Sequence, residues 1–545
     1  MSCTNTPTFT YQTRLELDAF QAQMLDALAR LYSEAERTLF ARLRAGAAIN
    51  DLKREFLPRC GITARQFNAI RVSLEGKIDA IRRRRPDLVT ELHQRIRRAE
   101  AVIARLFGKE HHSNRLHQKK RRLALLRARL ARLEADEKAG TVRLCFGGRK
   151  LFCAQFDLAA NGYTSNEEWR AAWQAARARQ FFVLGSGDET AGNQTCQASL
   201  QPDGTLALRL RLPDALAGPG GRFLMLSSVR FAYGQHQVAA ALASGRRVAS
   251  VTASGRATMK RTGTALSYRF LRDEKGWRVF VSCAAAPVAC TTHRLAGALG
   301  IDINADHLVL AELDRHGNPV HMSRIELPPA GKRSGQVRAL VGDAAVAVAA
   351  LARDAGKPVV IESLDFARKK AQLEGADAKR ARALSSFAYN RVIASVKAAC
   401  FRAGVDVVEV NPAFTSVIGA VNHARRRGIS QHQGAAIAIA RRGMGLSERA
   451  AVRRAIVPVR NGGHVTFDLP ARNRSKHVWL FWSDVRKRLR AALAEHVRCG
   501  GLQLPPPPLP PARPAKGATW TSAVQSRRAN RHHDRSGDVL DDVPL

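Results

Sequence analysis

Two acidic residues lie within or directly after apolar runs that otherwise predict buried strands. Asp302 interrupts the run LGIDI (299–303), and Glu362 follows the apolar part of PVVIESLDF (358–366). An ionised carboxylate in such a place is costly unless a cation compensates its charge. Carboxylate oxygens are the ligands that hard divalent cations prefer, and two such ions about 3.5–4 Å apart can hydrolyse a phosphodiester. The two acids therefore predict a divalent-metal site, and a strand cap or an arginine pair is the simpler alternative for Asp302.

The apolar pattern from residue 296 onward predicts the elements that would position these acids. Three strands are expected in LGIDI, HLVLAEL and PVHMSRIEL, with breaks at 304–306 and in the turn DRHGN. A helix over about 334–355, the strand that ends near Glu362, a helix over about 386–403 and the strand VDVVEVNP follow. The order β-β-β-α-β-α-β, with a final helix, matches the ribonuclease H-like fold. In that fold an acid on the first strand, an acid ending the fourth strand and a group on the last helix converge.

Four short blocks carry a more specific resemblance. GIDIN, IESLDF, VNPAFTS and AAIAIARRG occur in this order within residues 296–445. They resemble the RuvC-like nuclease domain of TnpB (OrfB-type) transposon-encoded proteins, which are relatives of the type V CRISPR effectors. The resemblance implies an RNA-guided DNA endonuclease with a two-metal mechanism. Mg²⁺ (or Mn²⁺) and a transposon-derived guide RNA would be its cofactors, and target DNA would be its other partner.

The first departure from the family pattern concerns the third metal ligand. Matching AAIAIARRG to the family places His432 where an aspartate is usual, so the implied catalytic and metal-binding set is Asp302, Glu362 and His432. An imidazole nitrogen suits Mn²⁺ better than Mg²⁺. Alternatively, His432 is an ordinary histidine at a helix start, in a site that binds without cutting. A nearby acid, Asp306 or Asp365, could also substitute.

The second departure is the missing zinc ribbon. The family usually carries four cysteines after the P-x-x-T-S block, whereas residues 417–443 contain none. No structural zinc is therefore expected. Arg425, Arg426 and Arg427 occupy the place of the ribbon and could contact the DNA backbone instead.

The chain as a whole is strongly basic. Its 545 residues carry a formal net charge of +42, which favours a nucleic acid as the partner. A membrane surface is the alternative, but no uninterrupted apolar run approaches the roughly 18–20 residues of a membrane span, so no membrane partner is expected. The N-terminus lacks a signal-peptide pattern, so we expect a bacterial cytoplasmic protein associated with the nucleoid. Nine scattered cysteines without a CxxC pair predict reduced thiols.

The rest of the sequence predicts further domains around the α/β nuclease domain, which is expected over 296–500. Residues 1–17 contain a first strand, residues 18–139 form a basic helical region and residues 140–295 form a β domain, either a barrel or a sandwich. The helical region would then be an insertion into the β domain. By resemblance, these parts correspond to the wedge and recognition regions of the family. The proline-rich tail, 501–545, is expected to be disordered.

Two charge runs in the helical region are candidate nucleic-acid contacts. They comprise Arg82, Arg83, Arg84, Arg85, Lys119, Lys120, Arg121 and Arg122. Apolar stripes beside them, from Leu92 to Leu106 and from Leu123 to Leu133, predict two long antiparallel helices. The simpler interpretation of the charge runs is a pair of solvated helix faces.

Three functions remain open on the sequence alone. The leading hypothesis is the RNA-guided endonuclease. A nuclease-dead, RNA-guided DNA-binding repressor of the same architecture is the second, and a strand-transferring transposase is the third. The segment FFVLGSGDETAGNQTC (181–196) also resembles a subgroup of TnpB-related proteins. A tight turn between strands is the role we expect for it.

Overall fold

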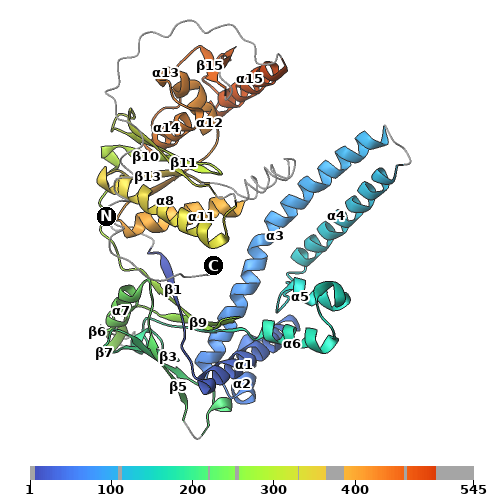
Figure 1. The fold of residues 1–545 in the computed structure, drawn as a ribbon, viewed down its shortest axis with the longest axis vertical. Coiled ribbons are helices and arrows are strands. Elements are labelled where there is room, and N and C mark those ends of the chain that lie inside the picture. The colour runs from blue at the N-terminus through green and yellow to red at the C-terminus, as the bar shows by residue number, and fades with distance from the viewer. Residues whose placement is uncertain are drawn as a thin grey trace. The chain divides into compact units, whose positions relative to one another are not determined.

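The computed structural model describes residues 6–108, 113–218, 221–251, 257–328, 331–363, 386–459 and 463–498. The chain divides into two compact units, an N-terminal unit over Thr4–Pro287 and a C-terminal unit from Val288 onward (Figure 1). The division lies before the boundary that the sequence suggests at 295/296. Asp365 and the proline-rich tail fall outside the described residues.

The N-terminal unit contains two antiparallel sheets that share one core. The first has the order β1-β9-β8-β2, with the bounds Thr8–Arg14, Gly276–Ala284, Ser267–Asp273 and Gln180–Val183. The second has the order β3-β4-β5, with the bounds Cys196–Leu200, Leu206–Arg211 and Phe223–Val229. Phe270 of the first sheet and Leu208 of the second belong to the same buried cluster. β1 pairs with β9 along its whole length, so the helices between β1 and β2 are inserted into a β domain.

The β domain is not a closed barrel, and its two sheets with one shared core match the sandwich alternative. Closure requires each edge strand to be hydrogen-bonded to a neighbour. Among the described residues the two sheets remain separate, and β6 (Arg246–Val251) and β7 (Ala257–Thr262) form a third, two-stranded ribbon. Alternating apolar residues predict which face of a strand is buried, but they do not say which edges pair.

Helices make up the insertion and its surroundings. Their bounds are α1 Ala19–Arg44, α2 Ile49–Cys60, α3 Ala64–Phe107, α4 Asn114–Lys138, α5 Arg149–Cys153, α6 Asn166–Arg177 and α7 Gln235–Ala243. Short 3₁₀ turns are η1 Ala154–Phe156, η2 Ala159–Asn161, η3 Thr190–Gly192, η4 Asp214–Leu216 and, in the C-terminal unit, η5 Arg294–Ala296. α3 and α4 form a long antiparallel pair (Figure 1). Leu92, Ile96 and Leu126 are buried between them, as the apolar stripes predict.

The C-terminal unit contains a mixed five-stranded sheet in the order β12-β11-β10-β13-β14. The bounds of these strands are Pro319–Glu326, His307–Leu313, Ala298–Ile303, Val359–Glu362 and Val407–Val410. β10 is antiparallel to β11 and parallel to β13, and β13 is parallel to β14. The elements follow the chain order predicted from the apolar runs.

Helices cover both faces of this sheet (Figure 1). α8 (Ser334–Asp354) and α11 (Ser386–Arg402) pack on the face that carries Ile301 and Ile361. α14 (Gln431–Gly443) packs on the opposite face, against Val360. Because side chains alternate along a strand, neighbouring residues of β10 and β13 enter different cores.

α8 is long and apolar enough, by length and composition, to cross a membrane. Its buried residues, which include Val341 and Val348, lie in the core shared with the sheet and α11. This is the position of a core helix in a folded α/β unit. The charged residues Arg338, Asp343 and Arg353 interrupt its apolar sequence.

The remaining elements of the C-terminal unit, most of which follow the sheet in sequence, form a further core. They are α12 Thr415–Gly419, the π-helical turn η6 Ala420–Ala424, α13 Arg425–Arg427, β15 Arg454–Pro458, β16 His464–Asp468 and α15 Val478–Arg498. Trp482, Val457 and Val465 are buried together in this core. The helical backbone is continuous through α12, η6 and α13, over Thr415–Arg427.

Candidate active site

Asp302 and Glu362 lie on one face of two adjacent parallel strands. The register aligns Gly300 of β10 with Val360 of β13. Asp302 and Glu362 each lie two residues beyond this last pair, and because side chains alternate along a strand they lie on the same face as Gly300 and Val360. Both side chains project to the α14 face, as Val360 does. The two acids that the sequence singles out thus lie on the same face of the sheet, near the same ends of two parallel strands.

His432, the second residue of α14, contacts Asp302. Its Nδ1 lies 2.9 Å from Oδ2 of Asp302. Nδ2 of Asn304 donates to the same oxygen at 3.0 Å. The Asp302 side chain is only 12% exposed, whereas that of His432 is 39% exposed. The carboxylate is therefore buried, and the imidazole lies on the open side of the site.

Local sequence fixes the start of α14 and hence the place of His432. Ser430 is the N-cap, and its hydroxyl accepts a hydrogen bond from the backbone N–H of Gln433 at 3.2 Å. The Gln433 side chain accepts one in return from the Ser430 N–H at 2.9 Å. This capping box places residue 432 in the first turn. The positive end of the helix dipole then lies beside the Asp302 carboxylate.

Glycine allows α14 to approach the sheet closely. A Cβ on Gly300 would lie 2.2 Å from the carbonyl oxygen of Ala436 and 2.7 Å from Cβ of Ala440. A Cβ on Gly443 would lie 2.5 Å from a methyl group of Val360. The glycine of the GIDIN block is thus required for the distance between Asp302 and the helix that carries His432.

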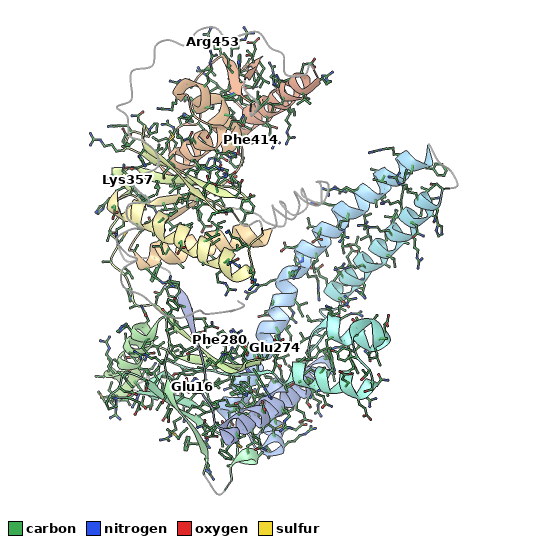
Figure 2. The ribbon with its side chains drawn as sticks, viewed as in Figure 1. Glu16, Glu274, Phe280, Lys357, Phe414 and Arg453 are labelled. Atoms are coloured by element: carbon green, nitrogen blue, oxygen red, sulfur yellow. The ribbon has the colours of Figure 1, made fainter. Side chains whose placement is uncertain are left out.

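Glu362 is held by a residue of the VNPAFTS block. Oγ1 of Thr415, which is buried, donates to Oε1 of Glu362 at 2.5 Å. Phe414, labelled in Figure 2, precedes it with a left-handed φ of 64° and starts α12. The guanidinium of Arg486 lies 5.0 Å from the centroid of the Phe414 ring. A phenylalanine whose backbone adopts the left-handed conformation is uncommon, and it persists only where the surrounding structure stabilises it. Here that turn directs Thr415 at Glu362.

His307, the first residue of β11, lines the same site. Its ring centroid lies 5.3 Å from that of His432, edge to face at 88°. Its Nδ1 lies 2.7 Å from Oδ1 of Asp306, and this contact lowers the pKa of Asp306. Its Nε2 is buried without a hydrogen-bond partner. Asp306, which we considered as a substitute acid, is therefore paired with His307.

Tyr389 of α11 also lies near the acids. Burial, with smaller contributions from the charges of Asp302, Asp306 and Glu362, raises its pKa to about 12. The phenol is therefore a neutral hydrogen-bond donor at physiological pH. Sequence reasoning missed Asn304 and Thr415 although both lie in recognised motif blocks. Neither His307 nor Tyr389 lies in such a block.

The donor set is suited to a divalent cation, although the side chains are not arranged around one. Two carboxylates and an imidazole on one face are ligands that Mg²⁺ or Mn²⁺ accepts. Within the described ranges, however, no three His, Cys, Asp or Glu side chains stand close enough together to hold a metal ion. Asp302 and His432 bind each other directly. They would have to exchange that contact for contacts with the ion.

Most of the predicted nucleic-acid contacts are accessible. Arg82, Arg83 and Arg84 are exposed on α3. Lys120, Arg121 and Arg122 are exposed on α4, where Lys119 is half-buried. Arg426 and Arg427 are exposed on α13, and Arg425 is half-buried.

Arg85 is the exception, because it is buried. Its Nη2 donates to the carbonyl oxygen of Thr141 at 2.5 Å. Arg85 precedes Leu92 by two helical turns, so it lies on the face of α3 that packs against α4. Arg85 holds the chain in place at Thr141, directly after α4. Because its side chain is buried there, the prediction that it contacts phosphate is wrong.

Comparison with known proteins adds little. No family model and no curated protein matches the chain. A cryo-EM structure of a Cas12f1–sgRNA–target DNA complex aligns at 10% identity over 80% of this chain and 99% of that chain, with a TM-score of 0.29. Thermus thermophilus RuvC aligns at 19% identity over 26% of this chain and 90% of that chain, with a TM-score of 0.20. Both TM-scores lie far below the value expected for a shared overall fold.

Proposed function

We propose that this protein is an RNA-guided DNA endonuclease of the TnpB type. Asp302, Glu362 and His432 would form the site that cleaves the DNA. One observation carries the proposal. His432 and Asp302 are 130 residues apart in sequence, yet their side chains are in contact at 2.9 Å, on the sheet face that also carries Glu362. The resemblance carried by the motif blocks implies that these three residues are metal ligands.

Each residue of the site has a role in this proposal. Asp302 and Glu362 would hold the divalent ions, Mg²⁺ or Mn²⁺, and His432 would complete the ligand set. When bound, the ions would supply Lewis-acid stabilisation and an activated water for phosphodiester hydrolysis. Asn304 and Thr415 orient the two carboxylates through the hydrogen bonds described above. Such outer partners keep metal ligands in position.

The charge of the chain supports a nucleic-acid assembly. A transposon-derived guide RNA, its DNA heteroduplex and a displaced strand together present many phosphates to a protein with a net charge of +42. Base pairing would read the target sequence, and the protein would read duplex shape. The exposed arginines and lysines of α3 and α4 would contact phosphates of this assembly.

The test is cleavage by the protein purified with its co-expressed RNA. Labelled target DNA is offered with Mg²⁺ or Mn²⁺, to the wild type and to Asp302→Ala. We expect cleavage by the wild type, loss of cleavage in the variant and retention of DNA binding by both. Equal cleavage by Asp302→Ala would refute the assignment of this site.

A nuclease-dead, RNA-guided DNA-binding protein is the second candidate. The direct contact between His432 and Asp302, in the place of two metal ligands, favours it. On this hypothesis the wild type binds target DNA tightly but cuts in neither metal. His432→Asp separates the candidates further, because it supplies the carboxylate that the family usually has. Cleavage that appears only in this variant would show that the natural histidine disables the site.

A further inference from the structure

The ribbon of β6 and β7 is separate from both sheets of the N-terminal unit. In the part of the chain that the structure describes, the two strands pair only with each other, over six residues each. Every residue of Arg246–Ala249 and of Ala257–Lys260 is exposed, so both faces of the ribbon meet solvent. Isolated two-stranded hairpins are marginally stable in water. A ribbon of this kind needs support at its base or from a partner.

The base of the ribbon is held tightly. Ser244, before β6, and Thr264, after β7, are joined by their hydroxyl groups at 3.0 Å, and the Thr264 N–H donates to the Ser244 hydroxyl at 2.9 Å. A Cβ on Gly263 would lie 3.0 Å from Cα of Gly245. These contacts fix the spacing at which the two strands leave the body of the unit.

The segment 181–196 supplies the second half of this support. A Cβ on Gly187 would lie 2.5 Å from the carbonyl oxygen of Gly263, and a Cβ on Gly192 would lie 2.3 Å from that of Thr264. Asn193 is fully buried, and its Nδ2 donates to the carbonyl oxygen of Leu266 at 2.8 Å. The glycines and the asparagine of this segment therefore anchor the chain where the ribbon ends.

The ribbon itself is strongly positive. Its register places Arg247 directly opposite Arg261, and Val248 opposite Lys260, next to Arg246. Like charges opposite each other destabilise a strand pair by themselves. The sequence contains no acidic residue between Asp214 and Asp273. The nearby acid outside this stretch is Asp188, whose pKa is lowered mainly by the Ser186 hydroxyl and also by Lys260. A polyanion would relieve this repulsion.

Two cations project from each face of the ribbon. Because side chains alternate, Arg246 and Lys260 share one face, and Arg247 and Arg261 share the other. Met259, 62% exposed, pairs with Ala249 nearer the tip of the ribbon, on the face that carries Arg247 and Arg261. A strand pair with cations on both faces can reach the phosphates of both walls of a groove at once, with apolar side chains against base edges.

We propose that the β6–β7 ribbon enters the major groove of double-stranded DNA and that Arg246, Arg247, Lys260 and Arg261 bind the flanking phosphates. The major groove of B-form DNA, about 12 Å wide, admits a two-stranded ribbon, whereas that of A-form RNA is deep and narrow. The inference rests on the proposed function only for the choice of DNA as the partner. It assigns a docking surface for duplex DNA that the candidate active site does not provide.

The test measures binding of the full-length protein, freed of nucleic acid, to a DNA duplex and to an RNA duplex of the same sequence. EDTA is present and no guide RNA is added, so failure here leaves the cleavage test of the proposed function untouched. The neutral variant carries R246Q, R247Q, K260Q and R261Q. The matched control carries R246K, R247K and R261K, which keeps the charge at the same positions. Thermal unfolding checks that both variants fold.

We expect the neutral variant to lose DNA affinity. The slope of the logarithm of its binding constant against the logarithm of the salt concentration, measured between roughly 50 and 200 mM, should become shallower by about 3 to 4. The lysine control should keep the wild-type slope. Wild-type affinity should also fall for DNA whose cytosines carry a glucosylated hydroxymethyl group, because this group fills the major groove. An unchanged slope in the neutral variant, an equal loss on the RNA duplex, or wild-type affinity for glucosylated DNA would each overturn the proposal.

Discussion

The two acids of the candidate site have neutral partners. Asn304 donates to Asp302, and Thr415 donates to Glu362. These donors orient the carboxylates without neutralising them. Since a buried anion is costly unless its charge is compensated, such a pair of acids is well suited to a cation. The hydroxyl of Thr415 should therefore matter for catalysis although it is not itself a ligand.

Thr415→Val removes this hydroxyl and preserves the shape of the side chain. We expect cleavage by the guide-loaded protein to fall roughly 10- to 100-fold, with a higher Mn²⁺ concentration needed for half-maximal rate. Thr415→Ser keeps the hydroxyl and should remain close to the wild type. The measurement is the cleavage rate in a metal titration, and an unchanged titration for Thr415→Val would show that Glu362 is oriented by other contacts.

His423, in the π-helical turn η6, predicts a pH dependence of stability. Burial, with smaller contributions from Arg427, Arg441 and Arg426, lowers its pKa to about 4. The unfolded chain binds a proton near pH 6.5 that the folded unit excludes until about pH 4. The contribution of the neutral imidazole is complete above pH 6.5 and is lost as the pH falls through 4. It amounts to at most about 3 kcal/mol of the free energy of unfolding.

Denaturant unfolding between pH 7 and pH 4 measures this effect. His423→Gln cannot titrate, so its stability should fall less steeply with acidification than that of the wild type. His316→Gln changes an exposed histidine and is the matched control. Parallel pH profiles for wild type and His423→Gln would contradict the assignment.

At the level of the elements, close packing through glycine delivers His432 to the acids. α14 crosses β10 at Gly300, and it meets α12 where Gly434 faces Gly419. A Cβ on Gly434 would lie 2.5 Å from the carbonyl oxygen of Gly419. Helix and sheet can approach this closely only where a side chain is missing. The position of the helix, and with it that of His432, should therefore respond to a single methyl group.

Gly300→Ala tests this packing. The added methyl would overlap the backbone of Ala436, so we expect a loss of about 1–3 kcal/mol in the free energy of unfolding and weaker cleavage. Gly342→Ala in α8 meets nothing within 4 Å and should stabilise its helix by about 0.5–1 kcal/mol with unchanged cleavage. Both variants are compared by thermal unfolding and cleavage rate. Full activity in a normally stable Gly300→Ala protein would show that the close approach is dispensable.

Considered as a whole, the molecule consists of two units, each with its own hydrophobic core, and the chain that contains them has a large positive net charge. The core of the N-terminal unit contains only residues before Pro287, and the cores of the C-terminal unit contain only later ones. The charge of +42 is spread over the entire chain. The proposed function requires both units to bind the same nucleic-acid assembly.

The whole assembly should therefore be highly sensitive to salt. We expect the logarithm of the affinity for guide RNA paired with target DNA to fall against the logarithm of salt with a slope steeper than about −5, which corresponds to six or more phosphate contacts. A fluorescence binding titration at several salt concentrations measures it. A slope near zero would mean that the charge serves a purpose other than nucleic-acid binding.

Local sequence patterns are enough to predict the order of the elements in the C-terminal unit. The spacing of apolar residues that marks a strand or a helix is visible within a short stretch of sequence. For this reason β10, α8, β13 and α11 could be predicted near their observed bounds. The motif blocks also identified Asp302, Glu362 and His432. Their assignment as metal ligands stays a prediction.

Features that depend on how distant elements meet became visible in the three-dimensional structure. It showed that Arg85 is buried, because the phase of α3 turns that position towards α4. It showed that the sheets of the N-terminal unit stay open within the described residues. It also joined Thr415 to Glu362 and His432 to Asp302. Register, helix phase and the distance allowed by Gly300 set these contacts, and no short window of sequence contains all three.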